Sequence, residues 1–215
     1  MASNVVLFIT LALLISFIYV SFAFDPRPLQ DFCVADPTGN AACKDPKTVT
    51  ADDFFLSGLD RPGSFNAYGL AFVIANATTV PGFNALGMTF ARLEFARNGY
   101  FPPHAHPRAS EVFYVAEGAV EVGFVTTYPE YKYYSKVVNK GDVFIIPVGL
   151  VHTVRNVAAR GESVALAALN SQNPGFVFIP DNVFAAKPAI NSTYLAGAFK
   201  VDESVVRVLQ TKPWL

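Results

Sequence analysis

The chain has 215 residues, with 16 basic and 17 acidic side chains and a formal net charge of -1. This balance provides no basic field for a nucleic-acid backbone, so we expect no nucleic-acid partner. Hydrophobic residues make up 52% of the chain and charged residues only 15%. Such a composition excludes intrinsic disorder and fits one globular domain behind a removable leader.

The first 23 residues predict a secretory signal peptide. Residues 5–22 carry no charged side chain, and Ser21 and Ala23 supply the small residues that a signal peptidase requires. Cleavage after Ala23 would leave a mature chain that begins at Phe24. An uncleaved transmembrane anchor is the alternative, because about 18 apolar residues can just span a bilayer. The absence of a flanking basic cluster favours cleavage, so we expect a secreted protein with no membrane contact afterwards.

Export determines how the two cysteines are interpreted. Cys33 and Cys43 are ten positions apart near the mature N-terminus, and an oxidising compartment lets them pair. We therefore expect a disulfide that ties down an N-terminal arm. Two sequons, at Asn76 and Asn191, make N-glycosylation chemically permitted at these positions.

Short runs rich in Val, Phe, Tyr or Ile predict an all-β body. The expected strands cover residues 69–74, 88–95, 111–116, 119–126, 131–138, 143–146, 151–154, 163–169 and 175–178. Gly118 and the segments 139–142 and 147–149 separate some of them as turns. Their close spacing is typical of a β-sandwich or a closed barrel.

The pattern changes towards the C-terminus, where two helices are expected. Asn191 or Ser192 can cap a helix that ends at Phe199, and Asp202 can cap another that ends at Thr211. The sequence therefore predicts an all-β body with a C-terminal helical appendage.

The three histidines of the chain form the most informative pattern. His104 and His106 are two residues apart, so on a strand they would project from the same face. Glu111 follows five residues later, and residues 107–110 must bend the backbone to return it to that face. His152 would arrive from a distant strand after a tight turn.

Three imidazoles and a carboxylate form a nitrogen and oxygen donor set that suits a divalent first-row metal ion. A lone histidine is more often an ordinary buried or surface residue. A close pair followed by an acid, with the remaining histidine in a turn-strand context, favours a metal site instead. A nucleophile triad is not expected, because a serine would lack a free histidine as its base.

Two segments carry a resemblance to a known family. The first consists of Gly99, Tyr100, Phe101, Pro102, Pro103, His104, Ala105, His106, Pro107, Arg108, Ala109, Ser110 and Glu111, with Gly118 after it. The second consists of Gly141, Pro147, Gly149, His152 and Asn156, in the pattern G-x5-P-x-G-x2-H-x3-N. They resemble the two cupin motifs of plant germins and germin-like proteins. Residues 29–36 and 170–175 also resemble germin-like signatures.

The resemblance implies a single cupin domain over residues 24–215, an all-β jelly-roll barrel with a short C-terminal helical extension. The N-terminal disulfide arm would precede a barrel that ends at about residue 180, and the helical tail would cover 181–215. One manganese ion would be held by His104, His106, Glu111 and His152. The family further implies a secreted glycoprotein of the plant cell wall or apoplast, assembled as a homohexamer, a trimer of dimers.

Departures from the family pattern bear on activity. In the oxalate-oxidising germins two asparagines are thought to bind the substrate, and the matching positions here are Ala91 and Phe101. Each unmade hydrogen bond to a charged group would cost about 1 to 3 kcal/mol, so oxalate oxidation is not expected. Asn98 replaces the first glycine of the motif, but asparagine tolerates a left-handed backbone.

Superoxide dismutation requires less of the protein, because a redox metal with an open position serves a small anion without an elaborate pocket. Manganese superoxide dismutase activity, reported among germin-like proteins, is therefore the expected reaction. The alternative is a non-catalytic metal-binding, storage or receptor-like cell-wall protein of the auxin-binding type. Tyr100, Phe101 and Phe113 could then form an aromatic mouth, although strand aromatics more often belong to a core.

Overall fold

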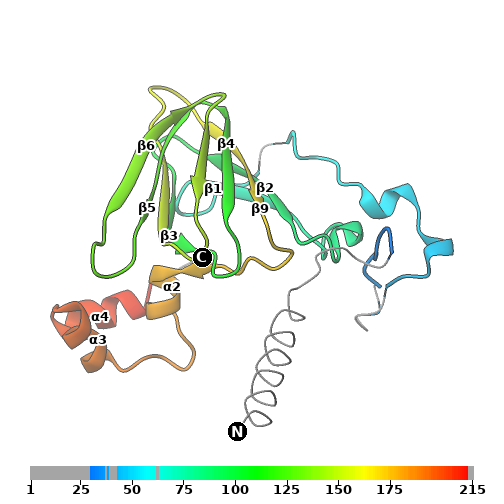
Figure 1. Cartoon of the computed structure of the whole chain (residues 1–215). Helices are drawn as coiled ribbons and strands as arrows, with labels where there is room; N and C mark the ends of the chain where they lie inside the picture. The colour runs from blue at the N-terminus through cyan, green and yellow to red at the C-terminus, as the bar shows by residue number, and fades with distance from the viewer. Residues whose placement is uncertain (1–29, 37, 39–42, 62, 213–215) are drawn as a thin grey trace, which may run out of the picture. The chain divides into compact units, whose positions relative to one another are not determined.

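The computed structural model describes residues 30–36, 38, 43–61 and 63–212 (Figure 1). The predicted signal peptide and its cleavage site lie outside the described residues. The chain divides into two compact units, Met1–Phe32 and Cys33–Leu215, and the second contains every described helix and strand. None of the helices in the described ranges is long and apolar enough to cross a membrane.

Antiparallel strands form two five-stranded sheets, which we call sheet I, with the order β1-β2-β9-β4-β7, and sheet II, with the order β10-β3-β8-β5-β6 (Figure 1). The strands are β1 Leu70–Ala75, β2 Thr89–Phe95, β3 Tyr100–Ala105, β4 Glu111–Glu117, β5 Ala119–Val125, β6 Tyr133–Asn139, β7 Val143–Ile146, β8 His152–Asn156, β9 Ser163–Leu169 and β10 Val177–Phe178. Neighbours in a sheet are mostly distant in sequence, which is the connectivity of a jelly roll.

The core lies between the two sheets. In β4 the buried residues Glu111, Phe113 and Val115 alternate with the exposed Val112 and Tyr114, as expected when one face of a strand packs on a core. Side chains from both sheets belong to a single buried cluster. Burial of each large apolar side chain contributes about 1.5 to 3 kcal/mol. The expected all-β barrel is confirmed.

The sequence does not predict strand β3. Pro102 and Pro103 lack the N–H groups that a sheet ladder uses, so the segment does not look like a strand. The structure accommodates them at an irregularity, because the register with β8 shifts between Phe101 and His104. Strand ends also differ from expectation: β6 begins at Tyr133, and β10 covers only two residues.

Three α-helices follow the barrel: α2 Ile179–Phe184, α3 Ser192–Phe199 and α4 Glu203–Gln210. Helix α2 is not expected from the sequence. The N-caps of the other two are as predicted, because the Asn191 side chain accepts from the Tyr194 backbone N–H and the Asp202 side chain accepts from that of Ser204, both at 2.8 Å.

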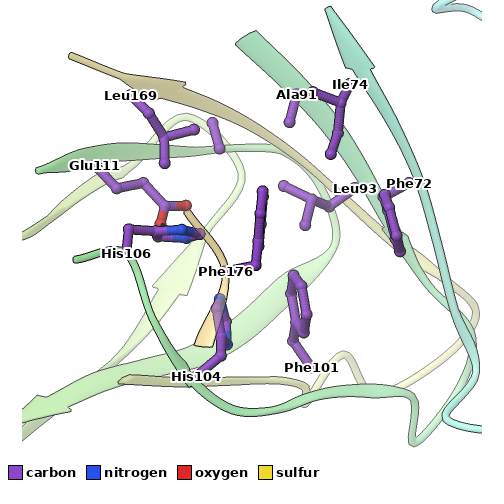
Figure 2. A pocket seen from close by; sticks show the side chains of 11 residues that line it. Phe72, Ile74, Ala91, Leu93, Phe101, His104, His106, Glu111, Leu169 and Phe176 are labelled. Atoms are coloured by element: carbon purple, nitrogen blue, oxygen red, sulfur yellow. Dashed lines mark ion pairs between the residues drawn. The ribbon is translucent and has the colours of Figure 1, made fainter. Parts of the chain in front are cut away.

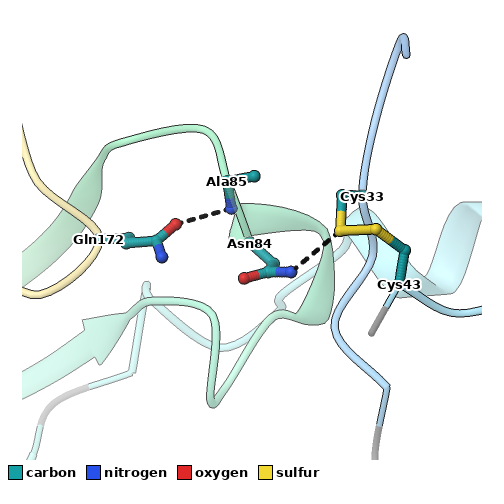
Figure 3. Close-up of a disulfide and its surroundings, with 5 residues drawn as sticks. All are labelled: Cys33, Cys43, Asn84, Ala85 and Gln172. Atoms are coloured by element: carbon teal, nitrogen blue, oxygen red, sulfur yellow. Dashed lines mark hydrogen bonds between the residues drawn. A yellow bond between two sulfur atoms is a disulfide. The ribbon is translucent and has the colours of Figure 1, made fainter. Parts of the chain in front are cut away.

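The N-terminal arm carries the expected disulfide between Cys33 and Cys43 (Figure 3). Short 3-10 helices occupy Pro46–Thr48, Ala51–Phe54 and Pro81–Phe83. The arm is tied to the third of these, since the backbone N–H of Ala35 donates to the Pro81 carbonyl at 3.0 Å. The Asn84 amide also lies 3.3 Å from Cys33 Sγ (Figure 3). These two contacts hold the arm beside the β1–β2 connection, and the disulfide joins two positions within the arm.

Candidate metal centre

The four side chains singled out by the sequence come from both sheets and meet inside the barrel. His104 on β3 and His152 at the start of β8 are register partners in sheet II. His106 lies one residue beyond β3, and Glu111 is the first residue of β4 in sheet I. Figure 2 shows His104, His106 and Glu111 directed towards a common cavity.

These side chains are packed closely enough to share one ion. The three imidazoles offer ligand nitrogens that all lie within 4.8 Å of one another. Glu111 Oε2 lies 3.3 Å from His106 Nε2 and 3.4 Å from His152 Nε2. All four residues are buried, which is costly for polar groups unless they are paired or bind a metal.

Backbone carbonyls set the orientation of each imidazole. His104 Nδ1 lies 2.8 Å from the Pro102 carbonyl oxygen, His106 Nδ1 lies 2.8 Å from that of Gly175, and His152 Nδ1 lies 3.0 Å from that of Leu150. Because a carbonyl can only accept, each Nδ1 carries the proton. The Nε2 atom of each ring is therefore the one that can face a ligand, as is usual for metal-binding histidines.

The electrostatics of the site also favour a cation. Burial, together with the neighbouring His152 and His106, lowers the pKa of His104 well below its usual value and keeps this ring neutral. Burial raises the pKa of Glu111, but His106 and His152 outweigh that effect and lower its pKa to about 2. The glutamate is thus a buried carboxylate at neutral pH.

Two buried atoms at the centre of the site lack a hydrogen-bond partner, namely Glu111 Oε2 and His152 Nε2. A carboxylate oxygen and imidazole lone pairs at such short separations require a positive charge between them, either a proton or a metal ion. A donor set of imidazole nitrogens and carboxylate oxygen suits divalent first-row metals. The residues present therefore fit a metal ion.

The cavity beside His104, His106 and Glu111 is small and mostly apolar. Its volume is about 20 Å³, which is room for about one water-sized ligand. Besides His104, His106 and Glu111 it is lined by Phe72, Ile74, Ala91, Leu93, Phe101, Ala167, Leu169 and Phe176 (Figure 2). No lysine or arginine contributes to this lining.

Aromatic rings hold two of the imidazoles from the cavity side. Phe101 stacks on His104 with ring centroids 3.9 Å apart, and Phe176 meets His106 edge-on at 4.7 Å. Phe113 instead lies in the core between the sheets, and Tyr100 is exposed. Of the three aromatic residues considered for a cavity mouth, only Phe101 lines the cavity.

The last residue of the second motif supports the fold. The Asn156 amide donates to the carbonyls of Phe95, Ala96 and Gly161, at 2.9 to 3.1 Å. Its oxygen accepts from the Ala158 backbone N–H and the Ser163 hydroxyl. Asn156 thereby ties β8 to the end of β2 and to the start of β9. At the start of the first motif, Asn98 has a φ of 62°, as expected for a residue that replaces glycine.

Two sheets in a jelly roll around a buried cluster of three histidines and a glutamate define a cupin. The family profile described as Cupin matches residues 57–207. Germin-like protein 8-9 of Oryza sativa subsp. japonica is 46% identical to this chain and covers 97% of it and 95% of its own length. Germin-like protein 8-11 of the same plant is 47% identical, and the match covers 89% of this chain and 88% of that protein. The chain therefore belongs to the germin-like proteins of the cupin family.

Solved structures agree with this assignment. A structure of oxalate oxidase is 39% identical, covers 87% of this chain and 97% of that chain, and has a TM-score of 0.82. Peruvianin-I, a cysteine peptidase from Thevetia peruviana latex, is 37% identical. The match covers 73% of this chain and 98% of that chain, with a TM-score of 0.68. In the present chain both cysteines form the disulfide, so neither provides a thiolate nucleophile.

The sequence predicts the four central side chains but not their supports. The carbonyl oxygens of Pro102, Leu150 and Gly175 orient the imidazoles, and a backbone group leaves no signal in a residue pattern. The one related signal in the sequence is the abundance of Gly and Pro around each histidine, which indicates irregular backbone there. Phe176 was not singled out either, because its contact with His106 depends on the path of a loop.

Proposed function

We propose that this chain is a secreted germin-like enzyme that binds manganese through His104, His106, Glu111 and His152 and dismutates superoxide. The observation that carries the proposal is the small cavity of about 20 Å³ beside His104, His106 and Glu111, which suits a small ligand better than a large one. Manganese bound there would supply the redox chemistry, in which one superoxide ion loses an electron to become dioxygen and another gains that electron and two protons from water to become hydrogen peroxide.

The lining of the cavity favours superoxide over oxalate. Ala91 and Phe101 occupy the positions of the asparagines thought to bind oxalate in the oxidising germins, and both lie on the cavity wall (Figure 2). Neither side chain can donate a hydrogen bond to a dicarboxylate. The apolar wall would therefore offer no hydrogen bond to offset the desolvation of a dianion with six heavy atoms. We therefore propose that oxalate is not a substrate.

The charge of the ligand set suits a small anion. Three neutral imidazoles and one carboxylate leave a divalent ion with a net charge near +1 and a trivalent ion near +2, which attracts superoxide in both states. Glu111 supplies the compensating charge, and the three Nδ1–H groups stay engaged with backbone carbonyls. The protein thus provides a frame that holds the donor atoms in place.

Secretion and assembly complete the proposal. A disulfide and germin-like relatives support an extracellular protein of the apoplast or cell wall. Asn76 and Asn191 remain the candidate N-glycosylation sites. We further propose that the chain forms a homohexamer, a trimer of dimers, as the family resemblance implies. The exposed side chains of Val205 and Val208 on α4 are available for such contacts.

The decisive experiment measures superoxide dismutation and oxalate oxidation by the native secreted oligomer, each normalised to its manganese content. We expect dismutation that scales with manganese and no peroxide from oxalate. His106→Ala should lose both bound manganese and activity. Glu111→Gln tests the carboxylate, and Glu117→Gln at the exposed end of the same strand is its matched control.

Full manganese occupancy with neither reaction would refute the enzymatic proposal. The non-catalytic alternative, a storage or auxin-binding type of cell-wall protein, would then take its place. His106→Ala protein that kept its manganese would refute the ligand assignment instead.

A further inference from the structure

A second depression lies on the outer face of sheet II, on the opposite side of the sheet from the metal ligands. It has a volume of about 150 Å³ and is lined by Tyr100, Phe101, Pro103, Glu121, Tyr133, Thr153, Val154 and Arg155. The strands that carry these residues, β3, β8, β5 and β6, are neighbours in the sheet (Figure 1). Apart from Phe101, which also lines the metal cavity, nothing in the proposed redox chemistry uses this surface.

A glycine in the middle of β5 gives this surface a flat aromatic floor. A Cβ atom on Gly123 would lie 2.7 Å from Cε2 of Tyr133 and 2.6 Å from Cβ of Ser135. The Tyr133 ring therefore occupies the space above Gly123, and its hydroxyl forms a 2.9 Å hydrogen bond with Thr153 Oγ1 on the next strand. A glycine in a strand interior often marks a close approach of this kind. Tyr133 as a residue nevertheless remains 46% exposed.

A second aromatic ring and two charged side chains lie next to Tyr133, in one row across the sheet. Tyr100 is the register partner of Arg155, and Arg155 is the register partner of Glu121. Arg155 Nε donates to Glu121 Oε2 at 3.0 Å, and a second guanidinium nitrogen reaches the same oxygen. Tyr100 is itself 44% exposed. Two exposed aromatic rings thus flank a paired carboxylate and guanidinium.

We propose that this depression binds a neutral saccharide, with a sugar ring stacked on Tyr133. The apolar C–H face of a pyranose matches an exposed aromatic ring, and its hydroxyls both donate and accept hydrogen bonds. Glu121 can accept from such hydroxyls, Arg155 can donate to them, and their mutual pairing leaves no net charge for an ionic ligand. A few convergent polar groups in a mostly apolar concavity are typical of a ligand site.

Charge also argues against a second copy of the chain as the occupant. The centres of protein interfaces are depleted in glutamate and aspartate, whereas Glu121 lies within this row. By contrast, the outer face of sheet I presents the exposed apolar residues Val112, Val143 and Ile145. That face has the composition expected of a subunit contact.

The test uses the native, secreted, manganese-loaded protein and measures saccharide binding by calorimetry and saturation-transfer NMR. The probes are cellohexaose, xylohexaose and mannohexaose, with hexagalacturonate as a charged comparison. We expect saturable binding of at least one neutral probe. Tyr133→Ala should weaken that binding by about tenfold or more. Tyr128→Ala is the matched control, because this tyrosine lies nearby in sequence, is 77% exposed and does not line the depression.

A second variant keeps the test decisive if Tyr133→Ala disturbs the fold. Tyr133→Phe retains the ring but removes the hydrogen bond to Thr153, so it should bind the probe within about threefold of the unchanged protein. The proposal is overturned if no neutral probe binds, if only hexagalacturonate binds, or if Tyr133→Ala and Tyr128→Ala behave alike. A change of oligomeric state in Tyr133→Ala without saccharide binding would also overturn it and identify the face as a subunit contact.

Discussion

Replacing Gly175 with alanine should loosen the metal site without removing any ligand. Gly175 has a φ of 72°, and a Cβ atom there would lie 2.9 Å from both Arg108 Nη2 and Pro107 Cγ. The proline ring is rigid, and the Arg108 guanidinium is held by two 2.7 Å hydrogen bonds to Asn173. The neighbours therefore cannot yield easily, and the Gly175 backbone must shift.

The shift matters because the Gly175 carbonyl orients a proposed ligand. It accepts the 2.8 Å hydrogen bond from His106 Nδ1, so its displacement would rotate the imidazole away from the other donors. Loss of such an outer partner typically lowers metal affinity by about 10- to 100-fold, or about 1.4 to 2.7 kcal/mol. The left-handed backbone adds about 1 to 2 kcal/mol of strain to the folding free energy.

Gly87→Ala separates these two effects. Gly87 has a φ of 65° with nothing within 4 Å of its Cβ position, so the variant carries the backbone strain alone. The assay is a titration of metal-free protein with manganese, in which the free ion is followed by electron paramagnetic resonance. We expect Gly87→Ala to bind as the unchanged protein does. Equal manganese affinity in Gly175→Ala and Gly87→Ala would refute the reasoning.

Two further predictions concern stability. Asn156→Ala removes the hydrogen bonds to the Phe95 carbonyl, the Ala158 backbone N–H and the Ser163 hydroxyl. It should lower the free energy of unfolding by about 3 kcal/mol in urea denaturation, and a loss below about 1 kcal/mol would contradict the role of Asn156. Acidification from pH 7.5 to 5 should destabilise the metal-free protein. Burial lowers the pKa of His104 in the folded state, whereas the unfolded chain keeps the usual pKa of 6.5. The unfolded chain therefore binds more protons than the folded protein over this range, and acid favours unfolding. A larger free energy of unfolding at pH 5 than at pH 7.5 would contradict this prediction.

The residues of the buried histidine and glutamate cluster were predictable because most of their information is local. His104, His106 and Glu111 lie within eight positions of one another, and a histidine pair followed by an acid has few other interpretations. His152 is distant in sequence, but it is the one remaining histidine and it follows the turn at residues 147–149. The N-caps Asn191 and Asp202 were predictable for the same reason, since a cap depends on its own side chain and the next few residues.

The features that sequence did not predict depend on contacts between distant segments. Strand β3 forms despite Pro102 and Pro103 because β8 and β10 pair with it on either side. No local preference predicts that outcome, since tertiary pairing overrides propensity. The floor formed by Tyr133 over Gly123 likewise depends on the register of β5 with β6, which strand alternation alone does not fix.

The positions of the proposed ligands separate metal binding from substrate choice. The histidines and Glu111 lie at or near strand ends, and backbone carbonyls hold the imidazoles, so the barrel itself sets the donor geometry. Ala91 and Phe101 only line the cavity, and neither supplies a donor atom to the metal cluster. Changes at these two positions can therefore alter which anion fits while the metal stays bound. On this reasoning, a solved oxalate oxidase with 39% identity can share the fold without sharing the substrate.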